Sequence, residues 1–588
     1  MKLLPLAVNS PSQSLEPQVD LSQPAPFRAI FPILLDGDQL VTSPEHLGVG
    51  YLVSVLRNAG VECRMIEVPA GGADDAIMDE IAAWQPDLVG ITLTTVSAAH
   101  ATEFGTKLRS KTSAFLLAGG PLASYRGAEL MDLPGWEFLD GLIRGEGELP
   151  ILRLVEALRT KNGLQQVPSL AHRVDGRVIQ NSLVAAIHNL DDIPFPARDQ
   201  FELHGGKPSP RFKYLRLSTS RGCTSFCTFC NAPHARNRIA PGPVWRGCSP
   251  TRIADEIEQL YKRYGCRSYA FVDSTFEDPG GTSRAKARLR AIAEELLDRK
   301  LPVYFGVCMQ ARNWKQEDQD LLELLWRAGL EYVLVGIEAG TDRDLKLWRK
   351  RSNVADNERI IGMLRDTSVY VQFGFISYHP YTTFETLKES YAFLRRSGVA
   401  HNFKKFLDRL ELYPGAEIVD TLREDGLLLP SYDERCDEFG YVFQDERILH
   451  LVESLHRLFG TNYQQHYAVP QALYKFEGDD SALHIFISRL ARMYRDEPVA
   501  AEILDRGHQG MEQIRQQLAE YNVQLISEFV DRAERNQLDP AEVAAASPKL
   551  ADFVLARVQE LRAVQMRTAV EMRRARYDLM AAGIESLA

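Results

Sequence analysis

The chain has 588 residues, of which 45% are hydrophobic and 25% are charged. These ordinary globular values exclude collagen-like, coiled-coil and intrinsically disordered proteins. A formal net charge of −11 argues against a bulk nucleic-acid binder, which usually carries a basic surplus. Apolar runs stay well short of the roughly 18 residues that span a bilayer, and the first residues read poorly as a signal peptide. We expect a cytoplasmic, multidomain protein with neither nucleic acid nor a membrane as partner.

The N-terminal part of the chain alternates short β-rich runs with amphipathic helices. Residues 1–27, rich in Pro, Ser and Gln, are expected to form a flexible leader. Residues 29–35 are a candidate for a buried strand, and the helical spacing over 46–60 ends at a glycine. This alternation predicts an α/β fold with a doubly wound parallel sheet over 28–165, in which ligands bind at the carboxyl ends of the strands.

Three further regions follow in the sequence. The proline-punctuated segment 166–205 reads as a connector. Residues 206–433 again alternate strand-like and helical runs in about six βα units, which predicts a (β/α)6 partial barrel with its chemistry at the C-terminal strand ends. Beyond residue 434 the strand signals disappear, and an Ala-, Leu-, Arg- and Glu-rich composition predicts a helical C-terminal domain over 434–588 that acts as a lid or docking domain.

A cysteine cluster stands at the start of the predicted barrel. Cys223, Cys227 and Cys230 have the spacing C-x3-C-x2-C. Three thiolates on one tight loop can hold three irons of a 4Fe–4S cluster and leave the fourth iron open to a ligand. A Cys3His zinc site is the alternative, because His234 follows four residues after Cys230. A strand-like run leads directly into the loop, which favours the cluster, since structural zinc sites rarely need a barrel behind them.

With Phe229 just before the last cysteine, the motif resembles the signature of radical S-adenosylmethionine enzymes. Other pieces resemble the subgroup that carries an N-terminal cobalamin-binding domain; they are residues 190–199, 244–257, 271–276, 336–340 and 410–428. The resemblance extends over about residues 28–430. It implies a 4Fe–4S cluster, S-adenosylmethionine and cobalamin as cofactors, and an electron donor of the flavodoxin or ferredoxin type.

The resemblance also implies roles for residues around the cluster. The three cysteines would be its ligands, and the other candidates would contact S-adenosylmethionine: Phe229 at the adenine, Asp273 and Ser274 near the methionyl amino group, and Arg312 and Glu338 at the carboxylate or ribose.

Simpler roles stay open for most of these residues. Phe229 suits a plain core position, Asp273 and Ser274 suit caps of the following helix, and Arg312 and Glu338 suit a mutual salt bridge.

Two further candidates come from the fifth strand, where 377–383 replaces the common Gly/Pro turn. Tyr378 and His379 there are candidate catalytic residues that face the substrate. The alternative for His379 is a packed histidine with its hydrogen bonds satisfied. Cys248 and Cys308 are interpreted as incidental thiols, although either could face the active site.

The doubly wound region resembles a cobalamin-binding domain that lacks the D-x-H-x-x-G string. The resemblance therefore implies cobalamin bound with its base off and without a histidine ligand, which favours shuttling between Co(I) and methyl-Co(III). A degenerate domain that has lost its cofactor is the alternative. The candidate cobalamin contacts are Leu47, Gly48, Thr94, Thr95, Ser97, Gly119, Gly120, Pro121 and Glu146.

The leading hypothesis is a monomeric, cobalamin-dependent radical methyltransferase. By the resemblance, a 5′-deoxyadenosyl radical takes hydrogen from a carbon of a small-molecule or peptide substrate, which then receives methyl from methylcobalamin. A second hypothesis keeps the cofactors but replaces methyl transfer with ring contraction, cyclisation or rearrangement. A third is a metal-stabilised binding module with an inactive cofactor domain.

Overall fold

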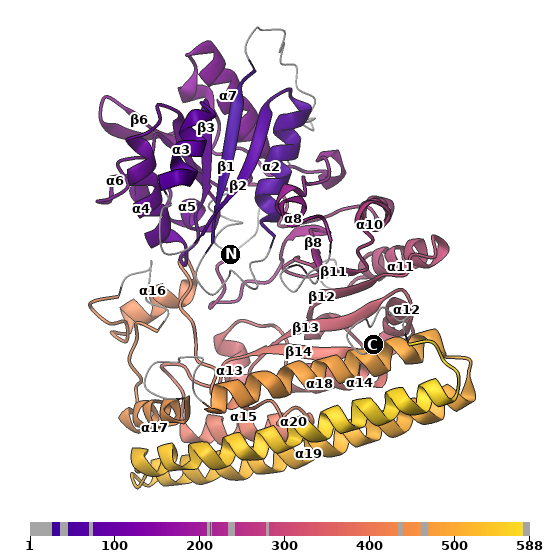
Figure 1. Cartoon of the computed structure of the whole chain (residues 1–588). Coiled ribbons are helices and arrows are strands. Elements are labelled where there is room, and N and C mark those ends of the chain that lie inside the picture. Colours follow the sequence, from indigo (N-terminus) through magenta and orange to yellow (C-terminus); the bar gives the residue numbers. More distant parts are fainter. Residues whose placement is uncertain are drawn as a thin grey trace. The chain divides into compact units, whose positions relative to one another are not determined.

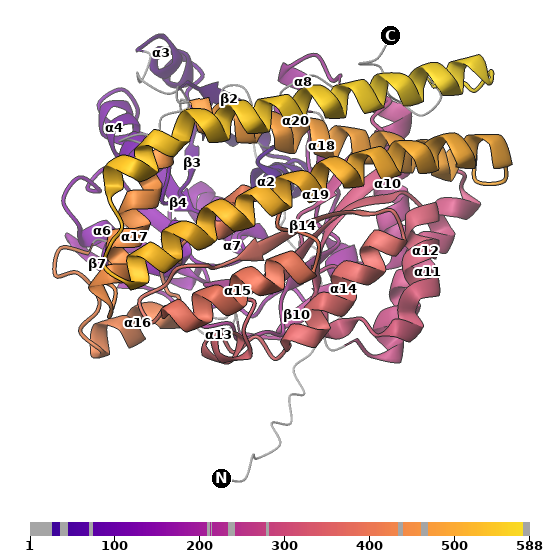
Figure 2. The ribbon, with the colours of Figure 1, turned by 90° about the horizontal axis from the view of Figure 1, so that it is seen from below.

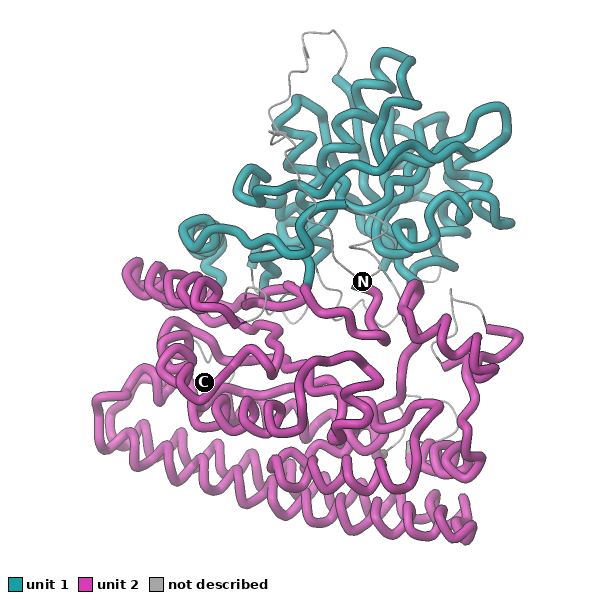
Figure 3. The backbone as a smooth tube through the Cα atoms, turned by 180° about the vertical axis from the view of Figure 1, so that it is seen from behind, with its two compact units in different colours: residues 1–223, 232–266 teal, residues 224–231, 267–588 magenta. Residues whose placement is uncertain are grey.

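The computed structural model describes residues 26–35, 45–69, 75–207, 212, 214–232, 241–277, 281–432, 439–459 and 468–579. The chain forms two compact units, residues 1–223 with 232–266 and residues 224–231 with 267–588 (Figure 3). Almost all of the expected leader lies outside the described residues, as does His234. The domain boundaries inferred from the sequence stay predictions.

Unit 1 contains a seven-stranded sheet in the order β2-β1-β3-β4-β5-β6-β7. Figure 1 labels its strands β1, β2, β3 and β6. The first five strands in the chain are parallel: β1 (Arg28–Leu34), β2 (Glu62–Val68), β3 (Leu88–Thr92), β4 (Phe115–Gly119) and β5 (Gly141–Ile143). An antiparallel hairpin then extends the edge, formed by β6 (Leu170–Val174) and β7 (Arg177–Gln180). The hairpin comes from the segment that the sequence suggests is a connector.

Helices bury both faces of this sheet. Ile30 and Leu34 of β1 belong to one apolar cluster, whereas Ala29, Phe31 and Ile33 belong to another. A strand covered on both sides must be apolar throughout, which explains why this run shows no polar alternation. The prediction of a doubly wound sheet is therefore confirmed. The helices are α2 (Leu47–Asn58), α3 (Asp75–Ala83), α4 (Ala98–Arg109), α5 (Pro121–Arg126), α6 (Glu129–Asp132) and α7 (Glu148–Thr160).

The rest of unit 1 is held by a buried guanidinium. Nη1 of Arg198 lies 2.7 Å from Glu45 Oε2, and its Nη2 lies 2.7 Å from Glu256 Oε1. A buried charged group is tolerated only when it is paired. The triad therefore ties the residues just before α2 to the later elements of unit 1. Those elements are α8 (Asp199–Leu203), β8 (Leu215–Leu217), the antiparallel pair β9 (Ser220–Gly222) and β10 (Trp245–Gly247), and α10 (Pro250–Tyr264).

Unit 2 contains parallel strands flanked by helices. Its strands are β11 (Ser268–Phe271), β12 (Tyr304–Gln310), β13 (Leu330–Glu338) and β14 (Tyr370–Phe375), which lie in the order β14-β13-β12-β11. Past β14, a parallel bridge joins Tyr378 to Arg409. The helices that follow the strands are α11 (Ser283–Asp298), α12 (Gln319–Arg327), α13 (Asp342–Leu347), α14 (Val354–Asp366), α15 (Phe384–Arg396) and α16 (Glu417–Glu424).

The two faces of these strands differ. Along β13, Val333, Val335 and Ile337 are fully buried, whereas the alternating residues are half-buried. The register places Cys308, Leu334 and Gln372 in one row of the half-buried face, and Gln310, Gly336 and Gly374 in the next. This face is the inner surface of the partial barrel, because the opposite face carries the fully buried side chains that the flanking helices cover.

Long helices form the C-terminal part of unit 2, as predicted. They are α17 (Glu446–His456), α18 (Ala468–Met493), α19 (Pro498–Glu534) and α20 (Pro540–Arg574), and the last three lie side by side (Figure 2). Trp326 Nε1 donates to Ser488 Oγ at 2.9 Å, and Arg489 pairs with Glu331 at 2.7 Å. Because Trp326 and Glu331 flank the start of β13, α18 lies at the N-terminal ends of the strands. It is therefore not a lid over their carboxyl ends.

Among the described residues, no helix has both the length and the apolar character required to cross a bilayer.

Candidate functional site

The entry to the cysteine loop depends on one glycine. Gly222 ends β9 with φ +90°, and a Cβ there would lie 2.2 Å from the carbonyl oxygen of Val244. Only glycine adopts this backbone without strain and allows the neighbouring strand so close. The half-buried Cys223 follows directly. The geometry at Gly222 therefore fixes where the first cysteine leaves the strand.

The other two cysteines lie in the short segment of unit 2. Cys227 is buried and Cys230 half-buried, and the backbone N–H of Cys230 donates to the carbonyl of Cys227 at 3.2 Å. Thr228 between them donates its backbone N–H to Trp348 O at 3.2 Å and its hydroxyl to Leu347 O at 3.0 Å. The loop is thus anchored to the end of α13.

Phe229 packs edge-on against the buried Trp348, with ring centroids 5.7 Å apart. One side of this ring is fixed by the core while the residue stays partly exposed. Phe229 therefore takes part in core packing, which was the alternative considered from the sequence, and its exposed part is available to a ligand.

The donor set of the loop fits an iron–sulfur cluster. Three thiols within eight residues match the soft sulfur ligands that such clusters require. Within the described ranges, no three His, Cys, Asp or Glu side chains are grouped to hold a metal ion. The fit therefore depends on the chemistry of the thiols.

The carboxyl end of β11 carries Asp273 and Ser274. Asp273 is 3% exposed, while Ser274 is exposed. Neither residue caps the following helix, because Thr282 is the N-cap of α11 and its side chain accepts from the backbone N–H of Ala285. Burial, with help from the carboxylates of Asp273 and Glu277, raises the pKa of Cys308 to about 11. Cys308 is thus a neutral thiol on the inner face of the barrel. The sequence analysis interpreted it as an incidental thiol.

Arg312 follows β12 and is held by two side chains that the sequence did not identify. Its Nε donates to Gln310 Oε1 at 3.1 Å, and its Nη2 lies 3.4 Å from Ser225 Oγ. Ser225 lies between the first and second cysteines. The structure therefore brings Arg312 to the cysteine loop, as expected for a ligand of S-adenosylmethionine. The sequence signal that could have identified Gln310 is its position, because Gln310 and Arg312 both lie at the end of a predicted barrel strand.

Glu338 pairs with a lysine and not with Arg312. Its Oε1 lies 3.0 Å from Lys350 Nζ, and both side chains are nearly buried. Glu338 has φ +66°, and a Cβ on Gly374 would lie 2.6 Å from its Oε2. A Cβ on Gly336 would lie 2.5 Å from Lys350 Nζ. Two glycines thus make room for this ion pair, and the salt bridge between Arg312 and Glu338 considered from the sequence is not formed.

Tyr378 and His379 are both 1% exposed. The Tyr378 hydroxyl lies 2.8 Å from that of Tyr391. His379 Nε2 lies 3.4 Å from Asp344 Oδ1, and its ring packs against Trp348 at 5.0 Å. Burial alone would raise the pKa of Asp344, but the hydrogen bond and charge of His379 outweigh it and lower that pKa. These contacts favour the packed role for His379 over contact with substrate.

In unit 1, the predicted cobalamin contacts follow the carboxyl ends of parallel strands. After β3, Thr94 and Ser97 bond each other, with Thr94 N and Thr94 Oγ1 each 3.0 Å from Ser97 Oγ. Thr95 is exposed, and so is Val96, at 62%. After β4, Gly119 has open space where a Cβ would stand, and Gly120 turns into α5 with φ +94°. The carboxyl edge of this sheet thus combines glycine backbone with an exposed loop and hydroxyl groups, a chemistry that fits the polar periphery of cobalamin.

The remaining predicted cobalamin contacts differ in exposure. Leu47 is buried at the start of α2, while Gly48 and Pro121 are exposed. Glu146 is engaged within unit 1: its Oε1 lies 2.6 Å from Arg246 Nη2, and its Oε2 accepts from the backbone of Ile187 at 3.1 Å. This carboxylate is therefore held by ion pairing, which favours an anchoring role.

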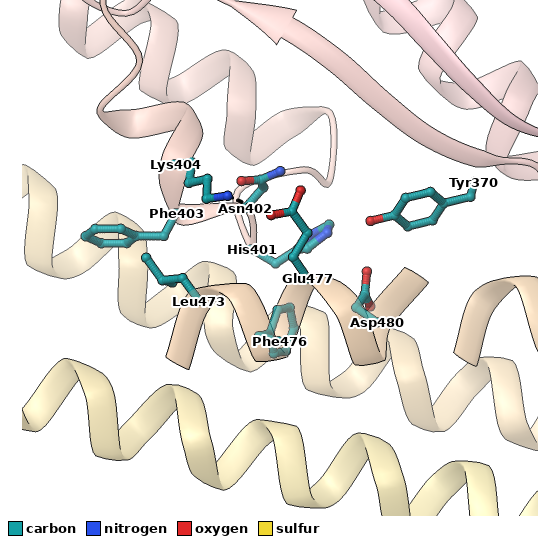
Figure 4. A pocket seen from close by; sticks show the side chains of 9 residues that line it. All are labelled: Tyr370, His401, Asn402, Phe403, Lys404, Leu473, Phe476, Glu477 and Asp480. Carbon is teal, nitrogen blue, oxygen red and sulfur yellow. Dashed lines mark hydrogen bonds and ion pairs between the residues drawn. The ribbon is translucent and has the colours of Figure 1, made fainter. Parts of the chain in front are cut away.

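A small cavity lies where α18 meets the residues after α15 (Figure 4). It is lined by Tyr370, His401, Asn402, Phe403, Lys404, Leu473, Phe476, Glu477 and Asp480. Its volume of about 20 Å³ suffices for roughly one water molecule. It is too small for an organic substrate.

Comparison with known protein families identifies a domain in each of the two α/β regions. Residues 217–394 match the radical SAM superfamily, and residues 38–155 match the B12 binding domain. The chain belongs to the cobalamin-dependent radical S-adenosylmethionine enzymes. The cofactors of this radical enzyme are accordingly a 4Fe–4S cluster, S-adenosylmethionine and cobalamin.

Similar proteins include enzymes of more than one kind. An uncharacterised methyltransferase of Pyrococcus horikoshii is 25% identical, over 77% of this radical enzyme and 95% of the methyltransferase. The anaerobic magnesium-protoporphyrin IX monomethyl ester cyclase of Cereibacter sphaeroides is 26% identical, over 60% of this chain and 57% of the cyclase.

A solved structure supports the fold. The cobalamin-dependent S-adenosylmethionine radical enzyme OxsB with aqua-cobalamin bound aligns with a TM-score of 0.65 at 18% identity. The alignment covers 91% of this chain and 84% of that chain. The architecture of parallel α/β regions followed by a helical C-terminal region is therefore confirmed.

Proposed function

We propose that this enzyme transfers a methyl group to a carbon atom of a small-molecule or peptide-derived substrate. The observation that carries the proposal is the match to the Pyrococcus horikoshii methyltransferase, which extends over 95% of that protein. The match also covers 77% of this chain, which is more than the radical SAM region over 217–394 alone.

Three thiols and three charged side chains carry the proposed chemistry in the barrel. When bound, the cluster and S-adenosylmethionine supply a 5′-deoxyadenosyl radical, and cobalamin supplies the methyl group. Cys223, Cys227 and Cys230 are the proposed iron ligands. The Arg312 guanidinium suits the carboxylate of S-adenosylmethionine, because a planar fork of N–H donors matches two oxygens.

The remaining groups at the strand ends suit the cationic and hydroxyl parts of the same ligand. Asp273 is buried beside the inner face and can accept hydrogen bonds from an ammonium group. Glu338 is held by Lys350 through Oε1, which leaves Oε2 for a ribose hydroxyl. Phe229 offers its partly exposed ring to the adenine.

In unit 1, backbone groups at Gly119 and Gly120 and hydroxyls at Thr94, Thr95 and Ser97 are the proposed cobalamin contacts. The open space at Gly119 supports this assignment. We also propose a flavodoxin- or ferredoxin-type electron donor and a monomeric enzyme.

A second candidate function is ring closure or rearrangement without methyl transfer. It is favoured by the similarity to the cyclase of Cereibacter sphaeroides. The two reactions differ in their coproducts. Methyl transfer consumes S-adenosylmethionine twice, once as methyl donor and once as radical source, so it releases S-adenosylhomocysteine and 5′-deoxyadenosine. A rearrangement releases no S-adenosylhomocysteine.

The first experiment is anaerobic reconstitution with iron, sulfide and cobalamin. We expect about four irons and about one cobalt per chain, and formation of both coproducts from S-adenosylmethionine under reducing conditions. A variant with Cys223, Cys227 and Cys230 changed to Ala should retain cobalt, lose iron and form no 5′-deoxyadenosine. Zinc in place of iron would overturn the proposal, and 5′-deoxyadenosine without S-adenosylhomocysteine would favour rearrangement.

A further inference from the structure

Gln310 lies on the inner face of the barrel, between the cysteine loop and Arg312. It ends β12, is 8% exposed, and shares a register row with Gly336 and Gly374. Neither glycine places a side chain beside it. The Gln310 amide is therefore the one side chain that these three strands contribute to this row. The Glu338–Lys350 pair fills the space where side chains of Gly336 and Gly374 would lie.

The amide oxygen of Gln310 joins two parts of the site. It accepts from Ser225 Oγ at 2.8 Å and from Arg312 Nε at 3.1 Å. Ser225 belongs to the cysteine loop, and Arg312 is the proposed partner of the S-adenosylmethionine carboxylate. Nε of the guanidinium donates to Gln310 and Nη2 lies 3.4 Å from Ser225 Oγ, so Nη1 and the second N–H of Nη2 form the edge that can take a carboxylate.

A buried carboxyl group fixes the backbone at this point. Glu277 Oε1 accepts from the Gln310 backbone N–H at 2.7 Å and from Asn313 Nδ2 at 3.0 Å. Glu277 is 0% exposed. This clamp holds residues 310–313 as a unit, so a shift of the Gln310 side chain is not absorbed by movement of the strand end. Gln310 therefore has a fixed platform from which to orient Arg312.

We propose that Gln310 is a positioning residue that aims Arg312 at the carboxylate of S-adenosylmethionine and couples it to the cysteine loop through Ser225. This inference rests on the proposed function. It predicts that replacing Gln310 weakens the binding of S-adenosylmethionine only by misplacing Arg312, and therefore only through contacts to the carboxylate of the ligand.

The test measures ligand binding to the anaerobically reconstituted enzyme. Gln310→Met removes the acceptor at nearly constant volume. We expect the dissociation constant for S-adenosylmethionine to rise about tenfold, the usual scale for losing an orienting hydrogen bond to a charged group. Binding of decarboxylated S-adenosylmethionine should not change, because it lacks the group that Arg312 contacts. Iron content should stay at the wild-type level.

A double-mutant cycle and a matched control complete the design. In an Arg312→Met background, Gln310→Met should have no further effect on affinity. Gln319→Met removes another glutamine amide, which donates to Met363 O and Thr367 Oγ1, and should leave affinity unchanged. Should Gln310→Met fail to fold, Gln310→Asn withdraws the acceptor and makes the same prediction.

Equal weakening of both ligands, or additivity with Arg312→Met, would show a merely structural role and overturn the inference. So would wild-type affinity in Gln310→Met. Failure of the wild-type enzyme to bind S-adenosylmethionine would instead contradict the proposed function.

Discussion

Glu338 has a backbone conformation that few non-glycine residues adopt. Its φ of +66° at the end of β13 costs roughly 1–3 kcal/mol, which the surrounding contacts must offset. Lys350 neutralises the carboxylate, and Gly336 and Gly374 leave the space in which the pair lies. Strain of this kind is concentrated at ligand sites, which agrees with the role proposed for Glu338.

Replacing Lys350 with Met should destabilise the protein by about 3 kcal/mol, because it leaves a nearly buried carboxylate unpaired. The measurement is the free energy of unfolding in urea. Lys346→Met removes an exposed lysine from α13 and should change it by less than about 0.5 kcal/mol. Adding Glu338→Gln to Lys350→Met should recover part of the loss; no recovery would mean that charge burial is not the cause.

At the scale of elements, the β9–β10 pair sets the start of the cysteine loop. Trp245 pairs with Gly222, and the carbonyl of Val244 lies where a Cβ of residue 222 would stand. The antiparallel pair can therefore form only with glycine at this position. The direction in which the chain leaves β9 is then fixed before Cys223 is reached.

We expect Gly222→Ala to displace the β9–β10 pair and reduce iron incorporation several-fold, since both the positive φ and the close carbonyl disfavour a Cβ. Iron and sulfide content after anaerobic reconstitution is the measurement. Gly362→Ala serves as control: it lies in α14 with nothing within 4 Å of the added methyl, and should retain full iron content. Wild-type iron content in Gly222→Ala would contradict the prediction.

Within unit 2, buried polar groups fasten the helical bundle to the N-terminal ends of the strands. Arg515 of α19 pairs with Asp480 of α18 at 2.7 Å within the bundle, and His484 Nε2 of α18 lies 3.1 Å from the carbonyl of Ser368, just before β14. Burial, reinforced by the charge of Arg515, lowers the pKa of His484 to about 3. Burial likewise lowers the pKa of His456 to about 4. Both histidines are therefore neutral in the folded protein at neutral pH.

Because the folded state resists protonating these histidines, acid should destabilise the protein. The unfolded chain takes up protons below about pH 6.5 while the native histidines do not, so stability is full above that pH. It should then fall by up to about 1.4 kcal/mol per pH unit for each histidine as the pH drops toward 4.

Urea unfolding of the wild type and of His484→Gln at pH 7.5 and pH 5 measures this effect. The variant should show a smaller difference between the two conditions. His188→Gln, at an exposed position, should retain the wild-type difference. An unchanged difference in His484→Gln would contradict the assignment to His484.

Local sequence patterns were sufficient to predict the order of the parallel α/β regions and the helical C-terminal part, because hydrophobic periodicity is a local property. The spacing of Cys223, Cys227 and Cys230 likewise identified the chemistry of the loop, since the ligands are neighbours in the chain. Arg312 lies directly after β12, at the strand end where the sequence predicted it, and parallel strands bring their carboxyl ends to one edge.

Which side chains meet at those strand ends depends on how the whole chain folds. The partner of Glu338 is Lys350 and not Arg312, and the hydroxyl of Tyr378 bonds that of Tyr391 within the core. The register between strands, which placed two glycines beside Gln310, is set by long-range packing that no local pattern encodes. The position of α18 at the N-terminal strand ends has the same origin, because helical periodicity shows that a face is buried but not what buries it.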